Sequence, residues 1–302
     1  MQIKIALLIL LTTSIATAQL KQKTKFNDCC KTDCTTDTIK SDVKLNRLII
    51  AGGGIVAANL AVYQPFKEVW WNEARTGFHF YRGYRRTEGY WDFGWNDSYF
   101  GHLDKLGHVY SSKILSEFLV ELANWVGYKK STSKIIGTTL SFIMMSEIEI
   151  YDSFFEEWGF SLADFSANAL GAYSPYLSEK YPLLKQFKLK MSYHASEQFN
   201  SEDSFIKDYQ GMTFWLAYQI KHVLPKNVQE NLPDYLNIAI GYGVDKPHGN
   251  VEIYLAPDIN LTRLIKTENP VFRKLIHFLD YIHVPMFTWK LTPQSKFYYL
   301  YF

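Results

Sequence analysis

Three polar motifs decide the fold: Asp104-Lys105-Leu106-Gly107-His108, then Glu149-Ile150-Tyr151-Asp152, then Gly159-Phe160-Ser161-Leu162-Ala163-Asp164 continuing to Asn168 and Gly171. Each motif lies in apolar sequence that has the periodicity of a helix. Burying an unpaired charge is costly, so acidic side chains and a histidine on apolar helix faces need partners. We therefore expect the three motifs to meet inside a bundle of three helices.

The helical periodicity predicts how each helix is oriented. Asp104 and His108 are four residues apart and share an inward face, while Lys113 lies on the opposite, wet face. The second helix, about residues 134–152, is apolar on nearly all sides, and we expect it to be the central helix. Its small or polar stripe is Thr138, Ser141, Met145, Glu149 and Asp152. The third helix begins at Ser161.

The expected cluster has the chemistry of a metal or acid–base site. It consists of Asp104, Lys105, His108, Glu149, Asp152, Asp164 and Asn168. Imidazole and carboxylate groups three or four residues apart on a helix can act as metal ligands or as a general acid–base pair. His108, Glu149 and Asp152 are the candidate ligands of a divalent metal, with Asp104 or Asp164 orienting the histidine.

The same residues also fit a purely structural role. Asp104 suits the cap of the helix that it opens, and Ser161 suits the N-cap of a capping box completed by Asp164. Glu149 suits a buried pair with Lys105 or His108. A pocket for a ligand or a lipid headgroup is a third interpretation of the cluster.

The N-terminus predicts export. Lys4 precedes an apolar run that ends in the small-x-small site Ala16-Thr17-Ala18, so we interpret residues 1–18 as a signal peptide rather than a membrane anchor. Residues 19–46 are polar and predict a disordered leader. Its cysteines suit a local disulfide, and a zinc site is less favoured because no fourth ligand has the required spacing. These cysteines are Cys29, Cys30 and Cys34.

Composition narrows the class of protein. At 302 residues and 47% hydrophobic, the chain can build a sizeable core in one or two domains. A formal charge of +2 argues against a nucleic-acid partner. The aromatic content of 17% suits a membrane interface, a β-rich protein, or both.

We place a helical domain at residues 47–182, opening with the apolar run 48–62. One interpretation of Gly52-x-Gly54-x-x-Ala57 in this run is a dinucleotide-binding loop. No second strand ending in an acidic residue follows, and an exported protein meets little nucleotide. We expect instead a small-residue helix, either buried or inserted in a membrane.

The segment 66–103 interleaves aromatic residues with arginines. It is either a membrane-interface belt or an irregular segment that covers the helical core. Arg82, Arg85 and Arg86 also suggest a pocket for an anionic headgroup.

Residues 183–302 predict an antiparallel β domain, either a sandwich or a partial barrel, so the fold class is α+β. One helix, about residues 270–281, interrupts the strands. The strand-like runs are 187–193, 205–220, 235–244, 251–259, 282–290 and 296–302, with turn signals between them. The last strand is aromatic and ends in Phe302, which is typical of outer-membrane proteins.

The combined motifs resemble a known family. Asp104-Lys105-x-x-His108, Glu149-x-x-Asp152 and the run from Gly159 to Gly171 resemble the YfiM-like family of predicted periplasmic lipoproteins, a domain of unknown function. The resemblance extends over the β half in the longer form found in Bacteroidota. The helical segment is also similar, more distantly, to VanZ-like membrane proteins. The family implies an envelope location and no proven reaction, and this chain lacks the lipidation cysteine after its signal.

These observations lead to two functional hypotheses for an exported protein of the periplasm or outer membrane. The first is a membrane-associated structural or accessory component of the cell envelope. The second is a metal-assisted or acid–base hydrolase that acts on a lipid or an envelope polymer, with a divalent metal as the possible cofactor. The expected partners are membrane lipid or envelope proteins, and neither nucleic acid nor nucleotide.

Overall fold

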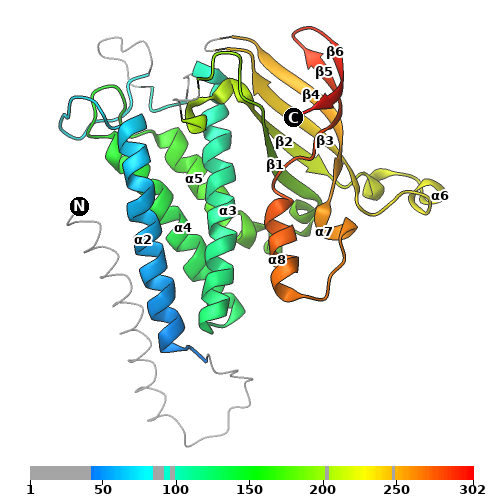
Figure 1. Ribbon diagram of the computed structural model, residues 1–302, viewed down its shortest axis with the longest axis horizontal. Coiled ribbons are helices and arrows are strands. Elements are labelled where there is room, and N and C mark those ends of the chain that lie inside the picture. The colour runs from blue at the N-terminus through cyan, green and yellow to red at the C-terminus, as the bar shows by residue number, and fades with distance from the viewer. Residues whose placement is uncertain (1–41, 84–91, 96–98, 201–203, 247–248) are drawn as a thin grey trace, which may run out of the picture.

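The computed structural model describes residues 42–83, 92–95, 99–200, 204–246 and 249–302, which form a helical bundle followed by an antiparallel sheet (Figure 1). This confirms the predicted α+β class. The bundle helices are α2 (Leu45–Val69), α3 (Leu103–Val126), α4 (Lys130–Asp152) and α5 (Leu162–Lys180). The strands are β1 (Phe187–Tyr193), β2 (Met212–Tyr218), β3 (Leu236–Val244), β4 (Val251–Ile259), β5 (Met286–Thr292) and β6 (Lys296–Tyr301), with α8 (Pro270–Leu279) between β4 and β5. The predicted signal peptide and the three cysteines lie outside the described residues.

The helix ends follow local chemistry. Ser161 is the N-cap of α5 and its hydroxyl accepts a hydrogen bond from the Asp164 amide at 3.1 Å, which confirms the predicted cap. The N-cap of α3 is His102 rather than Asp104, so the predicted cap at Asp104 is wrong. Asp104 lies in the first turn, where its carboxylate pairs with Lys105 instead. The glycine Gly127 ends α3 with a φ of 109°, a conformation that favours residues without a side chain.

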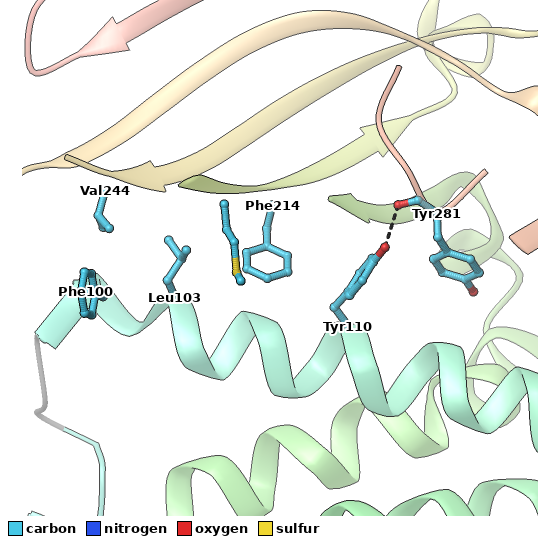
Figure 2. Packing of buried hydrophobic residues seen from close by; sticks show 7 residues of the cluster. Phe100, Leu103, Tyr110, Phe214, Val244 and Tyr281 are labelled. Carbon is cyan, nitrogen blue, oxygen red and sulfur yellow. Dashed lines mark hydrogen bonds between the residues drawn. The ribbon is translucent and has the colours of Figure 1, made fainter. Parts of the chain in front are cut away.

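The central helix is α3, not α4 as the apolar pattern of α4 predicts. The helix α3 contacts α2, α4, α5 and the sheet. Its sheet-facing side forms a hydrophobic core, in which Figure 2 shows Leu103 and Tyr110 pointing toward Phe214 and Tyr281. The Tyr110 hydroxyl donates a hydrogen bond to the backbone carbonyl of Tyr281 at 3.0 Å. The helical and β parts therefore share one core across α3.

Small residues allow the bundle helices to approach closely. A Cβ atom on Gly171 of α5 would lie 2.3 Å from the Val109 carbonyl oxygen, and one on Gly137 of α4 would lie 2.4 Å from the Val120 nitrogen. The buried side of α4 is small or polar: Ser133, Gly137, Thr138, Ser141, Ser146 and Glu149. Two apolar side chains of α4, Ile135 and Ile150, are exposed. This arrangement explains why α4 is not the central helix.

The sheet is a single six-stranded sheet in the order β1-β2-β3-β4-β5-β6, with all neighbours antiparallel. The described strands therefore do not form a two-sheet sandwich. The sheet curls, because Tyr301 of β6 packs on Trp215 of β2 and its hydroxyl lies 2.9 Å from Thr213 Oγ1. One face carries an apolar row that crosses every strand: Leu189, Leu216, Ile240, Leu255, Trp289 and Phe297.

The opposite face of the sheet buries charged groups. Lys190 is fully buried and its Nζ lies 2.9 Å from both Asp258 Oδ1 and Asp280 Oδ1. The His283 ring stacks on Trp215 and its Nδ1 lies 3.1 Å from Asp258 Oδ1. Burial by itself would raise the pKa of Asp258, but the contacts with His283 and Lys190 hold it below its ordinary value. This network fixes the inner side of the curled sheet.

The helix α2 lies along the outside of the bundle. It is long and apolar enough to cross a membrane, and Ala51 is its one buried residue. Gly52, Gly53 and Gly54 lie inside this helix, so they form no dinucleotide loop. The glycines have no neighbouring atoms within 4 Å of an added Cβ. The expected small-residue helix is confirmed, and its surroundings in the fold are open rather than buried.

Candidate functional site

Six of the seven residues of the predicted polar cluster line a cavity of about 470 Å³ between the bundle and the sheet. Asp104, Lys105 and His108 come from α3, Glu149 and Asp152 from α4, and Asp164 from α5. Most of the other lining residues are apolar or aromatic. They include Phe66, Trp70 and Trp71 from the α2 end, Tyr81, Trp158, and Met191, Tyr209, Met212 and Phe214 from the sheet side. The cavity is therefore amphipathic, with charged groups on one wall.

His108 and Asn168 join the three helices. His108 Nδ1 lies 3.0 Å from Asn168 Oδ1 and 3.6 Å from Glu149 Oε1. The Asn168 amide, which is fully buried, donates hydrogen bonds to the Met145 carbonyl oxygen and to Glu149 Oε1 at 3.3 and 3.5 Å. Ser112 also donates to Asn168 Oδ1 at 3.0 Å. One asparagine thus holds groups from α3 and α4 against α5.

Lys105 connects two carboxylates of the cluster. Its Nζ lies 2.7 Å from Asp104 Oδ2 and 3.1 Å from Asp164 Oδ1. Lys105 also donates a hydrogen bond to Asp164 Oδ2 at 3.2 Å. Asp164 Oδ1 is buried and accepts no hydrogen bond within the part of the chain that the structure describes. Its cationic neighbour is the Lys105 ammonium group at 3.1 Å.

Asp152 lies at the edge of the cluster, and its carboxylate is bound by a residue that follows α2. The indole Nε1 of Trp71 donates a hydrogen bond to Asp152 Oδ1 at 2.6 Å. The Trp71 ring is buried and stacks on Tyr151. Sequence reasoning placed Trp71 in an aromatic segment and did not connect it to the cluster, because its position after α2 gives no spacing signal relative to α4.

The cavity environment shifts the pKa values of the carboxyl groups apart. Burial, together with the negative charge of Asp164, raises the pKa of Glu149 well above its ordinary value. Burial also raises the pKa of Asp152 to about 7, although the Trp71 hydrogen bond opposes the shift. Burial raises the pKa of Asp104 as well. Burial alone would raise the pKa of Asp164, but His108 and Lys105 lower it below its ordinary value.

The cavity wall carries more acid than base. Its lining contains Asp104, Glu149, Asp152 and Asp164, against the cations Lys105 and His108. If all four carboxyl groups were ionised, the negative charge would exceed the positive charge even with His108 protonated. Buried like charges are unfavourable, so such a wall takes up protons or a cation.

Three of these residues have the arrangement of a metal site. One ligand atom from each of His108, Glu149 and Asp164 lies within 4.8 Å of the other two. The set predicted from sequence was His108, Glu149 and Asp152. In the structure Asp164 takes the third position, and Asp152 lies farther along α4 with Trp71 on its carboxylate. Asp104 and Asn168 contact the ligand set through Lys105 and His108.

The arginine pocket predicted from sequence is described only in part. Arg85 and Arg86 lie outside the described residues. Arg82 lines a separate cavity of about 450 Å³ with His79, Glu156 and Glu157. The described part of the aromatic segment covers the helical bundle, since Phe78 and Phe80 pack on Phe160.

Comparisons with known proteins give one family. Residues 88–180 match the model of a family described as "Predicted periplasmic lipoprotein (DUF2279)". The matched segment contains α3, α4 and α5 and so all seven residues of the predicted cluster. No curated protein and no solved structure matches the chain. The family description agrees with the predicted location, exported to the periplasm or outer membrane, and with a protein of the cell envelope.

Proposed function

We propose that this envelope protein binds a divalent cation through His108, Glu149 and Asp164 and uses it to hydrolyse an amphipathic substrate. The observation that supports the proposal most is the grouping of these three donors within 4.8 Å on the acidic wall of an apolar cavity. A single cation bound there would offset the carboxylate charge that Lys105 and His108 do not neutralise.

The donor set favours a particular kind of metal. One imidazole nitrogen and two carboxylate oxygens suit Zn²⁺ or Mn²⁺ better than soft metals that prefer thiolates. Three protein ligands leave a position for water or substrate, which is the pattern of catalytic rather than structural zinc sites. A metal held by these three residues would polarise a substrate oxygen and lower the pKa of bound water.

Asp152 and Lys105 are suited to assist such a reaction. With a pKa of about 7, Asp152 can accept and release a proton near neutral pH, as a general base or acid requires. Lys105 Nζ, on the same wall, supplies a positive charge for an oxyanion. The role of Asp152 is then proton transfer beside the metal rather than ligation.

The cavity indicates the class of substrate. A volume of about 470 Å³ is in the range of small-molecule sites, and Trp71, Tyr81 and Phe100 supply apolar walls. A molecule with an apolar portion and a hydrolysable polar group matches a cavity with apolar walls and one charged wall. Lipids and lipid-linked envelope precursors have that chemistry.

Metal titration tests the proposal. Protein stripped with a chelator is titrated with Zn²⁺ or Mn²⁺ in a calorimeter, and we expect one site per chain. His108→Ala and Glu149→Gln are expected to weaken binding at least about 10-fold, since each removes a ligand. The exposed Glu156→Gln is the control and keeps wild-type affinity. Equal affinity in all four proteins, or no binding in any, contradicts the proposal.

A structural role, the first hypothesis from the sequence, is the second candidate here, because Asn168 and Lys105 connect three helices through direct contacts. In that case His108→Ala destabilises the fold by roughly 1–3 kcal/mol through stranded buried partners. The two candidates differ in their response to metal. A structural network gives the same melting temperature with and without Zn²⁺ or Mn²⁺, whereas a cation site gives a higher one with metal.

A further inference from the structure

We infer that the face of the helical bundle formed by α2 and α4 lies against a lipid bilayer containing anionic phospholipid, with α2 in the hydrocarbon and the start of α2 and α4 at the headgroups. This inference does not depend on the proposed metal site. It rests on the outer surface of the bundle and on the charges at one of its ends.

The outer surface of α2 is apolar and open. From residue 48 to residue 66 the chain carries no charged side chain. Nineteen helical residues span about 28 Å at 1.5 Å each, close to the roughly 30 Å of a bilayer core. Ile49 is 65% exposed and Ile50 is 62% exposed. Arg47 and Lys67 mark the two ends of this uncharged run.

The helix α4 has the inverted pattern that lipid favours. Its buried side is small or polar, whereas Ile135 and Ile150 face outward. In lipid, the hydrophobic effect does not drive helices together, because apolar side chains are equally well accommodated by the lipid tails. Helix bundles there are held by close packing of small residues and by polar contacts. The close approaches at Gly137 and Gly171 fit this mode. Asn59 of α2 donates a hydrogen bond to the carboxylate of Glu147 of α4, so these two polar side chains satisfy each other.

The helices α2 and α4 begin near the end of α3 (Figure 1), and the residues at this end of the bundle are mostly basic. The Lys44 amide donates to the Val126 carbonyl oxygen, which brings the start of α2 to the end of α3. Lys129 and Lys130 begin α4. Lys44, Lys129 and Lys130 are exposed and have no ion-pair partner among the described residues. Asp42 is an acidic residue at this end.

Arg47 and Trp125 complete this basic end. The Arg47 guanidinium lies over the Trp125 ring, 5.1 Å from its centroid, and donates to the Trp125 carbonyl oxygen at 2.9 Å. The Trp125 ring is itself exposed. Tryptophan with lysine and arginine at the end of an apolar helix is the composition of a membrane interface. Its positive charge complements the phosphates of anionic lipid, and this complementarity favours a bilayer over a second copy of the chain.

Vesicle flotation of the full chain tests the inference. The protein is reconstituted by detergent removal into vesicles of phosphatidylcholine alone or mixed with phosphatidylglycerol. We expect binding to both, and at least about 10-fold tighter binding to the anionic vesicles, which high salt reduces. The combined variant Lys44→Gln, Arg47→Gln, Lys129→Gln and Lys130→Gln is expected to lose the preference for anionic vesicles.

Matched variants separate charge from hydrophobic contact. Neutralising Lys207, Lys226, Lys246 and Lys266, which lie outside the bundle, removes the same charge and is expected to keep the preference. Ile49→Gln with Ile50→Gln is expected to weaken binding to both vesicle types, whereas Leu264→Gln with Ile265→Gln is not. Because Arg47 contacts Trp125, the pair Lys129→Gln and Lys130→Gln is tested alone and is expected to lose part of the preference.

Two results would overturn the inference. One is equal binding to neutral and anionic vesicles that the basic-end variants leave unchanged. The other is absence of the protein from the vesicle fraction, and a stable dimer that Ile49→Gln and Ile50→Gln dissociate would then show that a second copy covers α2.

Discussion

The indole of Trp71 donates a hydrogen bond to Asp152 Oδ1 across 2.6 Å and so ties the end of α2 to the end of α4. This contact stabilises the ionised carboxylate in a cavity wall where burial favours the neutral acid. The proton affinity of Asp152 therefore depends on a residue that is 81 positions away in the chain.

Removing the donor should raise the pKa of Asp152 above about 7, because Trp71→Phe keeps the aromatic packing and deletes the hydrogen bond. Carboxyl carbon shifts in NMR spectra, recorded against pH in the presence of a chelator, measure this pKa. A pKa that stays the same or falls in the variant would show that the indole does not stabilise the carboxylate.

Asp152 should also make stability depend on pH. Its folded pKa of about 7 lies above the ordinary value of 3.8, so the native state holds the proton more tightly than the unfolded chain. The stability from this group is complete below about pH 4 and is lost as the pH rises toward 7. Asp152→Asn cannot ionise, so its stability relative to the wild type should increase over that range by roughly 2–4 kcal/mol. Denaturant unfolding with a chelator present checks this, and a constant difference between pH 4 and 7 would refute it.

Close packing in the bundle predicts opposite effects for two glycines. Gly171→Ala places a methyl group against the Val109 carbonyl oxygen and should cost about 1–3 kcal/mol, because α5 must move away from α3. Gly52→Ala has open space around it and should be neutral or stabilising by up to about 1 kcal/mol through helix propensity. Thermal and denaturant unfolding of the two variants give the comparison. Equal destabilisation by both would contradict the packing described for α3 and α5.

The buried lysine in the sheet should be indispensable for stability. Lys190→Met leaves Asp258 and Asp280 without their shared cation in a region that water does not reach, which should cost about 3–5 kcal/mol. The exposed Lys296→Met is the control, with an expected change within about 0.5 kcal/mol. Denaturant unfolding of the two variants measures the difference. If both lysines could be replaced at equal cost, the buried network would not be stabilising.

The helical pattern predicted the bundle well because its signals are local. The starts of α3 and α5 and the end of α4 follow from periodicity and from the Ser161 cap, which neighbouring residues determine. The strands were also located, since alternation and turn residues act over a few positions. The position of α4 was wrong, because an all-round apolar helix suits a bilayer surface as well as a protein core.

Contacts between distant segments could not be predicted from the same signals. The pairing of Lys105 with Asp164 and of Trp71 with Asp152 depends on how α5 and the end of α2 pack on the bundle. For β1, the alternation does not reveal which set of side chains is buried. The structure buries Lys190 and exposes Phe187, because two aspartates from other segments neutralise the lysine. The acidic Asp258, which follows the apolar run from Ile253 to Pro257, was the available signal for this network.

The most direct test of the cation site is an anomalous-difference map from crystals of the protein grown with Mn²⁺. Our account predicts a peak within about 2.0–2.3 Å of His108 Nδ1 or Nε2 and of carboxylate oxygens of Glu149 and Asp164. A map with no peak there, in which Lys105 Nζ still bridges Asp104 and Asp164 and Asn168 still binds His108, would contradict it.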